Sequence, residues 1–204
     1  MTLKKTDSGI YVADYDAHFA ELLKSTPIYQ PEDLETALTF TKNRRIAYDV
    51  GAHIGTWSKQ LAKHFTHVYA FEPHPDNFTL LGMNCIEKNI SKLNVAVGAA
   101  YGRVAMGMGD NSGMHFVIPG NEVYMIQLPD FGGLDFLKVD VEGFEYYVLL
   151  GALTLLDKYN PIVIFENKAS VQARYQESVN PVAFMESLGY KTAAISRSDI
   201  IMVR

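Results

Sequence analysis

The sequence predicts an α/β fold in which helices cover both faces of a mostly parallel sheet. From residue 46 onward, short apolar runs alternate with helical segments of about ten to fifteen residues, which is typical of right-handed β-α-β units. A loop with two glycines follows the first of these runs, and two further runs near the C-terminus can pair as an antiparallel hairpin. We therefore expect a Rossmann-like three-layer sandwich, mostly parallel, that ends in an antiparallel C-terminal hairpin.

Residues 1–45 are expected to form an N-terminal helical lead-in, and residues 46–204 a single cofactor-binding domain. Ala17, Ala20 and Leu23 have helical spacing, which predicts a helix over residues 14–24. A second helix is expected to begin near Pro31, because proline followed by two acidic residues is typical of a first helical turn.

The remaining elements follow from the apolar runs between turn residues. Strands of the parallel sheet are expected at residues 46–50, 67–71, 93–97, 134–139 and 161–165, and the antiparallel pair at 190–195 and 200–203. Helices are expected at residues 58–65, 75–88 and 142–159. Residues 102–128 break this rhythm, because three strand-like runs separated by glycine and asparagine predict a β-meander or hairpin excursion.

Composition excludes several classes of function. The chain has 204 residues, of which 48% are hydrophobic and 20% charged, as is usual for a folded domain with a core. A formal net charge of −5 argues against a nucleic-acid partner, because binding to phosphates needs a basic surface. No apolar run approaches the roughly 18 residues of a membrane span, and the residues after Met1 do not predict a signal peptide. We expect a cytoplasmic protein, and the oligomeric state is not predicted.

The loop after the first strand carries the strongest functional signal. Its sequence, Asp-Val-Gly-Ala-His-Ile-Gly at residues 49–55, lies where open α/β sheets bind ligands. Gly51 is expected to let the backbone approach a ligand, and Gly55 to let the following helix pack closely. Glu72 ends the second strand, where an acid can accept hydrogen bonds from both hydroxyls of a ribose. Together these features predict a nucleoside-containing cofactor.

Three modes of nucleotide binding compete for this loop. A P-loop requires a final Gly-Lys-Ser/Thr, which is absent. A dinucleotide fold prefers Gly-x-Gly-x-x-Gly, whereas this loop has Gly-x-x-x-Gly with Asp49 ahead of it. An acid at that position suits a ligand with an ammonium group, such as the methionine part of S-adenosylmethionine, better than a pyrophosphate. S-adenosylmethionine is the expected cofactor, and a nicotinamide-dependent oxidoreductase is the alternative.

Three further blocks follow the glycine loop. They are Phe-Glu-Pro-His-Pro-Asp-Asn at residues 71–77, Asn-Val-Ala-Val-Gly at 94–98, and a block at 135–145 that continues to residue 166. The last block contains Lys-x-Asp-x-Glu-Gly and is the most distinctive. In this order, the four blocks resemble the FkbM-type methyltransferases, a family of S-adenosylmethionine-dependent enzymes mostly associated with O-methylation. The resemblance implies a class I methyltransferase fold.

The resemblance also implies which residues bind the cofactor. The methionine part is expected at the glycine loop and the end of the fourth strand, beside Asp49, Gly51, His53, Gly55 and Asp140. The ribose is expected at the end of the second strand, beside Glu72 and Pro73, and the adenine after the third strand, beside Asn94. The family usually has asparagine where this chain has His53, so this residue is expected to contribute through its backbone.

Methyl transfer from a sulfonium is an in-line displacement, and a hydroxyl acceptor gains from a base that takes its proton. Asp140 ends the fourth strand beside the expected methyl position, Glu142 opens the next helix and Glu166 ends the fifth strand. These three acids are the expected catalytic residues. Lys138 shares the strand face of Asp140.

The other titratable residues predict no metal centre, because no cluster of histidine, cysteine and aspartate has metal-ligand spacing. His53 and His115 are candidate acid–base groups in the cleft, whereas Glu145 is expected on a solvated helix face. The expected function is S-adenosylmethionine-dependent methylation, most simply O-methylation of a hydroxylated small molecule or sugar. A non-catalytic module that keeps the cofactor fold is a further alternative.

Overall fold

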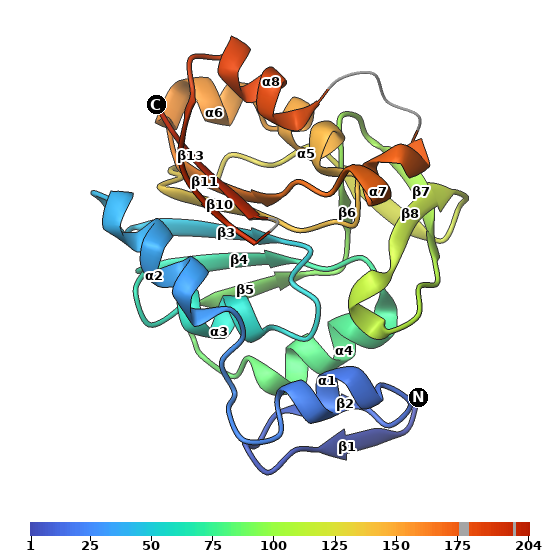
Figure 1. Ribbon diagram of the computed structural model, residues 1–204. Coiled ribbons are helices and arrows are strands. Elements are labelled where there is room, and N and C mark those ends of the chain that lie inside the picture. Colours follow the sequence, from blue (N-terminus) through green and yellow to red (C-terminus); the bar gives the residue numbers. More distant parts are fainter. Residues whose placement is uncertain (176–179, 198) are drawn as a thin grey trace.

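The computed structural model describes residues 1–175, 180–197 and 199–204. A seven-stranded sheet of order β12-β13-β11-β10-β3-β4-β5 forms its centre (Figure 1). The strands are β3 (Ile46–Val50), β4 (His67–Phe71), β5 (Ile90–Leu93), β10 (Phe136–Val139), β11 (Ile162–Glu166), β12 (Lys191–Ser196) and β13 (Asp199–Val203). Strands β5, β4, β3, β10 and β11 are parallel, and β13 runs antiparallel to both β11 and β12. The predicted sheet with its antiparallel C-terminal pair is confirmed.

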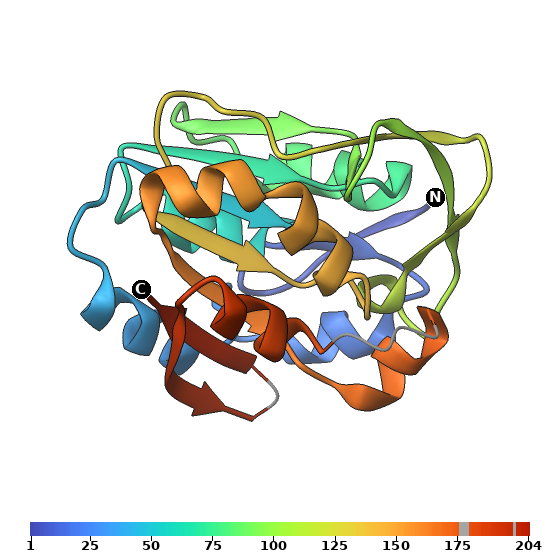
Figure 2. The same ribbon diagram turned by 90° about the horizontal axis from the view of Figure 1, so that it is seen from above.

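Helices cover both faces of this sheet, which confirms the three layers. One face carries α2 (Pro31–Phe40), α3 (Thr56–Leu61) and α4 (Pro75–Asn84), and the other α5 (Glu145–Gly151), α6 (Leu153–Tyr159) and α8 (Pro181–Ser187). Figure 2 shows α5 and α6, in orange, lying over the strands of the sheet. Along β10, Phe136 packs with the first group of helices and Leu137 with the second, as the period of two in a strand requires.

The expected helix over residues 142–159 begins later and is divided. Glu142 and Gly143 have φ angles of +56° and +100°, which an α-helix cannot contain, so α5 begins only at Glu145. The division falls at Ala152, between α5 and α6. The end of α5 packs closely against the backbone at Gly98, since a Cβ atom at Gly151 would lie only 2.1 Å from the Gly98 carbonyl oxygen.

Residues 102–128, here called the excursion, form a second sheet together with β6. This sheet lies at the end of the central sheet toward which β3 and β4 point (Figure 1). Its strands are β6 (Ala96–Val97), β7 (Gly102–Gly107), β8 (Phe116–Pro119) and β9 (Val123–Ile126), in the order β6-β9-β7-β8. The expected strand over residues 93–97 is therefore split, because β5 ends at Leu93 and β6 joins the second sheet. A 3-10 turn, η1 (Ser112–Met114), precedes β8.

The lead-in holds strands as well as helices. Strands β1 (Leu3–Lys5) and β2 (Tyr11–Ala13) form an antiparallel pair ahead of α1 (Ala17–Leu22) and α2. Helical spacing alone did not reveal this pair, since each strand has only three residues. Val12, Phe19 and Leu23 share a buried cluster with Ile54 and Leu80, so the lead-in packs against the domain.

The part of the chain after β11 begins with α7 (Ala169–Gln172) and the 3-10 turn η2 (Ala173–Tyr175). Within the described residues, no helix combines the length and the apolar composition that crossing a membrane requires.

Candidate functional site

Two adjoining pockets lie at the carboxyl ends of β3, β4 and β10. The smaller pocket encloses about 520 Å³ and the larger one about 1300 Å³, and both volumes include space that is open to solvent. They share five lining residues, namely Gly51, His53, Gly113, Asp140 and Glu142. The two pockets therefore form one cleft, and these shared residues mark its junction.

The glycine loop forms the floor of this junction. Gly51 has φ +77°, and a Cβ atom there would lie 1.8 Å from the carbonyl oxygen of Asp140. The neighbouring backbone thus requires glycine at position 51, whether or not a ligand also approaches this residue. Gly55, with φ +92°, lines neither pocket, and a Cβ atom there would meet the Sγ atom of Cys85 at 2.4 Å. The close helix packing expected at Gly55 is present.

Glu72 lies at the end of β4 and faces the smaller pocket, as does Pro73. Its Oε2 atom accepts a hydrogen bond from the backbone N–H of His53 at 2.8 Å, and its Oε1 atom accepts one from that of His74 at 2.8 Å. The side chain is buried, and this burial raises the pKa of Glu72 to about 7 against the opposing effect of the two N–H donors.

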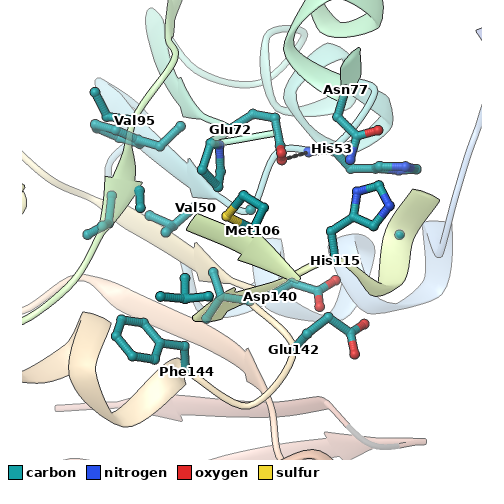
Figure 3. A pocket seen from close by; sticks show the side chains of 18 of the residues that line it. Val50, His53, Glu72, Asn77, Val95, Met106, His115, Asp140, Glu142 and Phe144 are labelled. Carbon is teal, nitrogen blue, oxygen red and sulfur yellow. Dashed lines mark hydrogen bonds between the residues drawn. The ribbon is translucent and has the colours of Figure 1, made fainter. Parts of the chain in front are cut away.

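The rest of the smaller pocket is mostly apolar. Figure 3 shows Val95 and Phe144 on one side of it, and Asp140, Glu142 and His115 on the other. A pocket with an apolar wall and one hydrogen-bonded acid suits a ligand that has both a flat apolar part and hydroxyl groups.

Besides Gly55, two further residues expected at the ligand line neither pocket. Asp49 is fully buried and lines neither pocket, because its Oδ2 atom accepts a hydrogen bond from Ser58 Oγ at 2.6 Å and its Oδ1 atom lies 3.5 Å from Lys138 Nζ. Asn94 is exposed and donates from Nδ2 to the carbonyl oxygen of Glu72 at 2.9 Å. Both residues support neighbours that line the cleft.

The three expected catalytic acids converge in the larger pocket. Asp140 follows β10 and Glu166 ends β11, and the carboxyl ends of these adjacent parallel strands share one edge of the sheet. Asp140, Glu142 and Glu166 each have one carboxylate oxygen in a group of three, and these three oxygens all lie within 4.8 Å of one another. Such a set of oxygens is of the kind that divalent cations accept. The absence of a metal, predicted from spacing along the chain, therefore stays a prediction.

Two lysines compensate part of this negative charge. Lys138 Nζ lies 3.4 Å from Asp140 Oδ2, and Lys168 forms an ion pair with Glu166. Glu142 has no such lysine partner among the described residues. Burial, followed by the nearby charges of Asp140 and Glu166, raises the pKa of Glu142 to about 7.

Strained backbone gathers around the larger pocket. Among the described non-glycine residues, five have a positive φ angle, and four of them line this pocket: Gln30, His53, Glu142 and Arg197. Left-handed backbone costs on the order of 1 kcal/mol or more per residue and is found preferentially at functional sites.

Segments without a motif complete the cleft. The lead-in contributes His18, Phe19 and Tyr29 to the larger pocket, and the excursion contributes Ser112 and His115 to the smaller one. His115 is buried, and neither ring nitrogen has a hydrogen-bond partner among the described residues. Sequence reasoning identified only His115 of this group, because the others reach the cleft through long-range packing that leaves no local pattern.

The expectation for Glu145 is wrong. Its side chain is completely buried, and its Oε1 atom accepts hydrogen bonds from the backbone N–H groups of Val141 and Gly143 at 3.1 Å each. The left-handed turn at residues 142–143 folds the chain back over the start of α5, which removes Glu145 from solvent. This burial raises the pKa of Glu145 to about 8.

Solved structures share this fold at low sequence identity. A precorrin-6y C5,15-methyltransferase from Geobacter metallireducens is 13% identical with a TM-score of 0.52, over 88% of this chain and 89% of that one. The N-methyltransferase NodS from Bradyrhizobium japonicum is 12% identical with a TM-score of 0.51, over 84% and 90%. These similarities show the class I methyltransferase fold. No curated protein sequence matches the chain.

An FkbM methyltransferase from Methylobacillus flagellatus is 18% identical with a TM-score of 0.48, over 86% of this chain and 46% of that one. The chain thus spans less than half the length of that protein. The family described as methyltransferase FkbM domain matches residues 49–192, which is more than half of the chain. The chain therefore belongs to the FkbM family of methyltransferases.

Proposed function

We propose that the protein methylates a hydroxyl oxygen of a small molecule or sugar, with S-adenosylmethionine as the methyl donor and Glu142 as the general base. The bound cofactor supplies a methyl group on a positively charged sulfur, ready for in-line displacement. The protein has to bind this cofactor, align the acceptor hydroxyl and remove its proton.

The smaller pocket supports the cofactor part of the proposal. Glu72 offers carboxylate oxygens to ribose hydroxyls, and the apolar wall with Val95 and Phe144 suits an adenine ring. Asn77 Oδ1 and both ring nitrogens of His115 border this pocket and are buried without hydrogen-bond partners among the described residues. Buried polar atoms are rarely left unpaired, so a polar ligand is the expected partner.

The position of Glu142 carries the proposal of a general base. Glu142 lies at the junction of the two pockets, in the left-handed turn that precedes α5. A carboxylate with a pKa of about 7 is largely ionised slightly above neutral pH, yet it is basic enough to accept a proton from a hydroxyl as the new bond forms. Asp140 and Glu166 are paired with lysines and are less free to accept that proton.

The larger pocket supports the class of acceptor. Phe19, Tyr29 and Trp57 line it together with charged side chains that include Lys168 and Arg197. Aromatic surfaces beside polar groups suit a hydroxylated molecule that presents both apolar faces and hydroxyl edges, such as a sugar. The net charge of −5 supports an acceptor other than nucleic acid. We also propose that the protein acts in the cytoplasm and that its cofactor-binding domain begins near residue 46.

Calorimetric titration with S-adenosylmethionine and S-adenosylhomocysteine tests the cofactor. We expect both to bind, and Glu72→Ala to weaken both strongly because it removes the acceptor for the ribose hydroxyls. A panel of hydroxylated acceptors, assayed for release of S-adenosylhomocysteine, tests the reaction. If neither compound binds, the proposal fails, and binding of NADH in their place would favour the oxidoreductase. Binding without turnover on any acceptor would favour a non-catalytic module.

A further inference from the structure

A chain of hydrogen bonds beside the cleft joins three segments that are distant in sequence. Asp16 belongs to the lead-in, Ser112 to the excursion and His53 to the glycine loop. The Ser112 Oγ atom lies 2.7 Å from His53 Nε2 and is hydrogen-bonded to Asp16 Oδ2, which also accepts the Ser112 backbone N–H at 3.0 Å. Asp16 and Ser112 are both 2% exposed, so water does not compete for these bonds.

The direction of each bond follows from the protons available. Three donors, the Phe19 N–H and both groups of Ser112, hold the pKa of Asp16 below its ordinary value, so this carboxylate only accepts. The single hydroxyl proton of Ser112 is therefore donated to Asp16. The Ser112 oxygen can then only accept from His53, which places a proton on Nε2.

His53 is consequently a neutral ring with a lone pair on Nδ1. Burial lowers the pKa of His53 to about 3, so the ring carries one proton, and Ser112 holds that proton on Nε2. No described residue donates a hydrogen bond to Nδ1, and this atom is not among the buried unpartnered ones. Because His53 lines both pockets, its free acceptor is available to a ligand at their junction.

A cofactor with an α-ammonium group needs acceptors at this loop. Asp49, the acid that the sequence assigns to it, is fully buried and lines neither pocket, with Oδ2 bonded to Ser58 and Oδ1 facing Lys138 at 3.5 Å. Among the residues shared by the two pockets, the side-chain acceptors are the carboxylates of Asp140 and Glu142 and the Nδ1 atom of His53. A neutral imidazole nitrogen accepts an N–H from an ammonium without the cost of burying another charge.

We propose that His53 binds the amino group of the cofactor's methionine part through Nδ1, and that Ser112 and Asp16 are positioning residues that hold the ring in the tautomer this requires. The inference rests on the proposed function, because it needs S-adenosylmethionine or its product in the cleft. In this proposal, the contacts of the lead-in and the excursion with the glycine loop serve to orient His53.

Comparing the affinities for two ligands distinguishes the loss of this contact from a general loss of cofactor binding. S-adenosylhomocysteine carries the amino group, and 5′-methylthioadenosine keeps the nucleoside but lacks the amino-acid part. For His53→Ala we expect the Kd of S-adenosylhomocysteine to rise about tenfold while that of 5′-methylthioadenosine stays unchanged, as for the loss of one hydrogen bond to a charged group. His53→Asn offers an amide oxygen as an acceptor and is expected to keep most of the affinity.

The matched control is His67→Ala, because His67 begins β4 at the opposite end from Glu72 and forms its own histidine–serine pair with Ser91 at 2.9 Å. It should bind both ligands like the unmodified protein. An equal loss of both ligands in His53→Ala and in His53→Asn overturns the proposal, and so does unchanged affinity in both variants. If the unmodified protein binds neither ligand, the proposed function itself fails, which is a distinguishable result.

The tautomer has a direct spectroscopic readout. In ¹⁵N NMR of the folded protein, with the signals of His53 assigned by their absence in His53→Ala, we expect a protonated Nε2 and an unprotonated Nδ1. Ser112→Ala should mix the two tautomers and weaken S-adenosylhomocysteine several-fold, whereas the control Ser91→Ala should change neither. A proton on Nδ1 in the unmodified protein overturns the proposal. The same holds if Ser112→Ala keeps both tautomer and affinity.

Discussion

All residues that line the smaller pocket lie within the matched family region, whereas the larger pocket also takes side chains from the lead-in. Glu72 is held by two backbone N–H groups within the matched family region. The larger pocket takes His18, Phe19 and Tyr29 from the lead-in, which precedes that region. It also contains most of the left-handed non-glycine residues among those described.

This difference teaches how such a fold can keep one ligand and vary another. Backbone donors and strand ends are determined by the topology of the sheet, so they suit the cofactor that the proposed reaction always needs. Side chains from the docked lead-in can be replaced without changing the sheet, so those that line the larger pocket suit the acceptor. The acids at the junction, Asp140 and Glu142, belong to both pockets.

The largest effect is expected for Glu142→Gln. Removal of the general base should lower kcat by about 10²- to 10⁴-fold while the Kd of S-adenosylhomocysteine changes little. Because Glu142 must lose its proton to act, and its pKa is about 7, the rate of the unmodified protein should rise with pH through about 7. The variant should lack this step. Initial rates with an acceptor from the panel provide the measurement.

Glu186→Gln is the control, because this exposed glutamate lies on α8, away from the residues of either pocket. A Glu142→Gln variant that keeps its rate within about twofold would remove the base from Glu142 and leave Asp140 and Glu166 as candidates. In that case the junction would differ from the proposal in its chemistry, though not in its geometry.

Much of the junction was predictable because the ends of parallel strands share one edge of a sheet. Strand ends alone identified Asp140 and Glu166 together, and their carboxylates do converge. The same reasoning placed Asp49 at the ligand, but it cannot show whether a residue at a strand end faces the cleft or the helix layer. The bond between Asp16 and Ser112 spans 96 residues, and no local pattern announces such a contact.

A second prediction concerns the floor shared by the two pockets. Gly51→Ala should destabilise the protein by about 3 kcal/mol or more, because its φ angle of +77° disfavours alanine and the new Cβ atom would overlap the Asp140 carbonyl. Gly82→Ala in α4 is the matched control, since nothing lies within 4 Å of its Cβ position and its backbone is helical. It should stabilise by about 0.5–1 kcal/mol.

Urea unfolding measures both glycine variants. If Gly51→Ala stays within about 1 kcal/mol of the unmodified protein, the glycine loop and the end of β10 can separate without loss. The junction would then be adaptable, and the contrast between a cofactor pocket determined by topology and a variable acceptor pocket would weaken.

The smallest of the three effects concerns Glu145, which supports the turn that presents Glu142. Its folded pKa of about 8 lies above the ordinary 4.5, so the unfolded chain ionises first as the pH rises. Stability should therefore fall between about pH 4.5 and about pH 8 and level off above, once the folded form also loses its proton. Glu145→Gln keeps an acceptor oxygen for Val141 and Gly143 without this penalty.

Chemical unfolding of both proteins at about pH 6 and about pH 8 isolates this contribution, because other titrating groups cancel in the difference. The stability of the unmodified protein relative to Glu145→Gln should fall by about 2 kcal/mol over that interval. If the two proteins keep a constant difference, Glu145 ionises at its ordinary pKa and is reached by water in solution. The turn at residues 142–143 would then open toward solvent, and the acceptor side of the junction would be less rigid than the cofactor side.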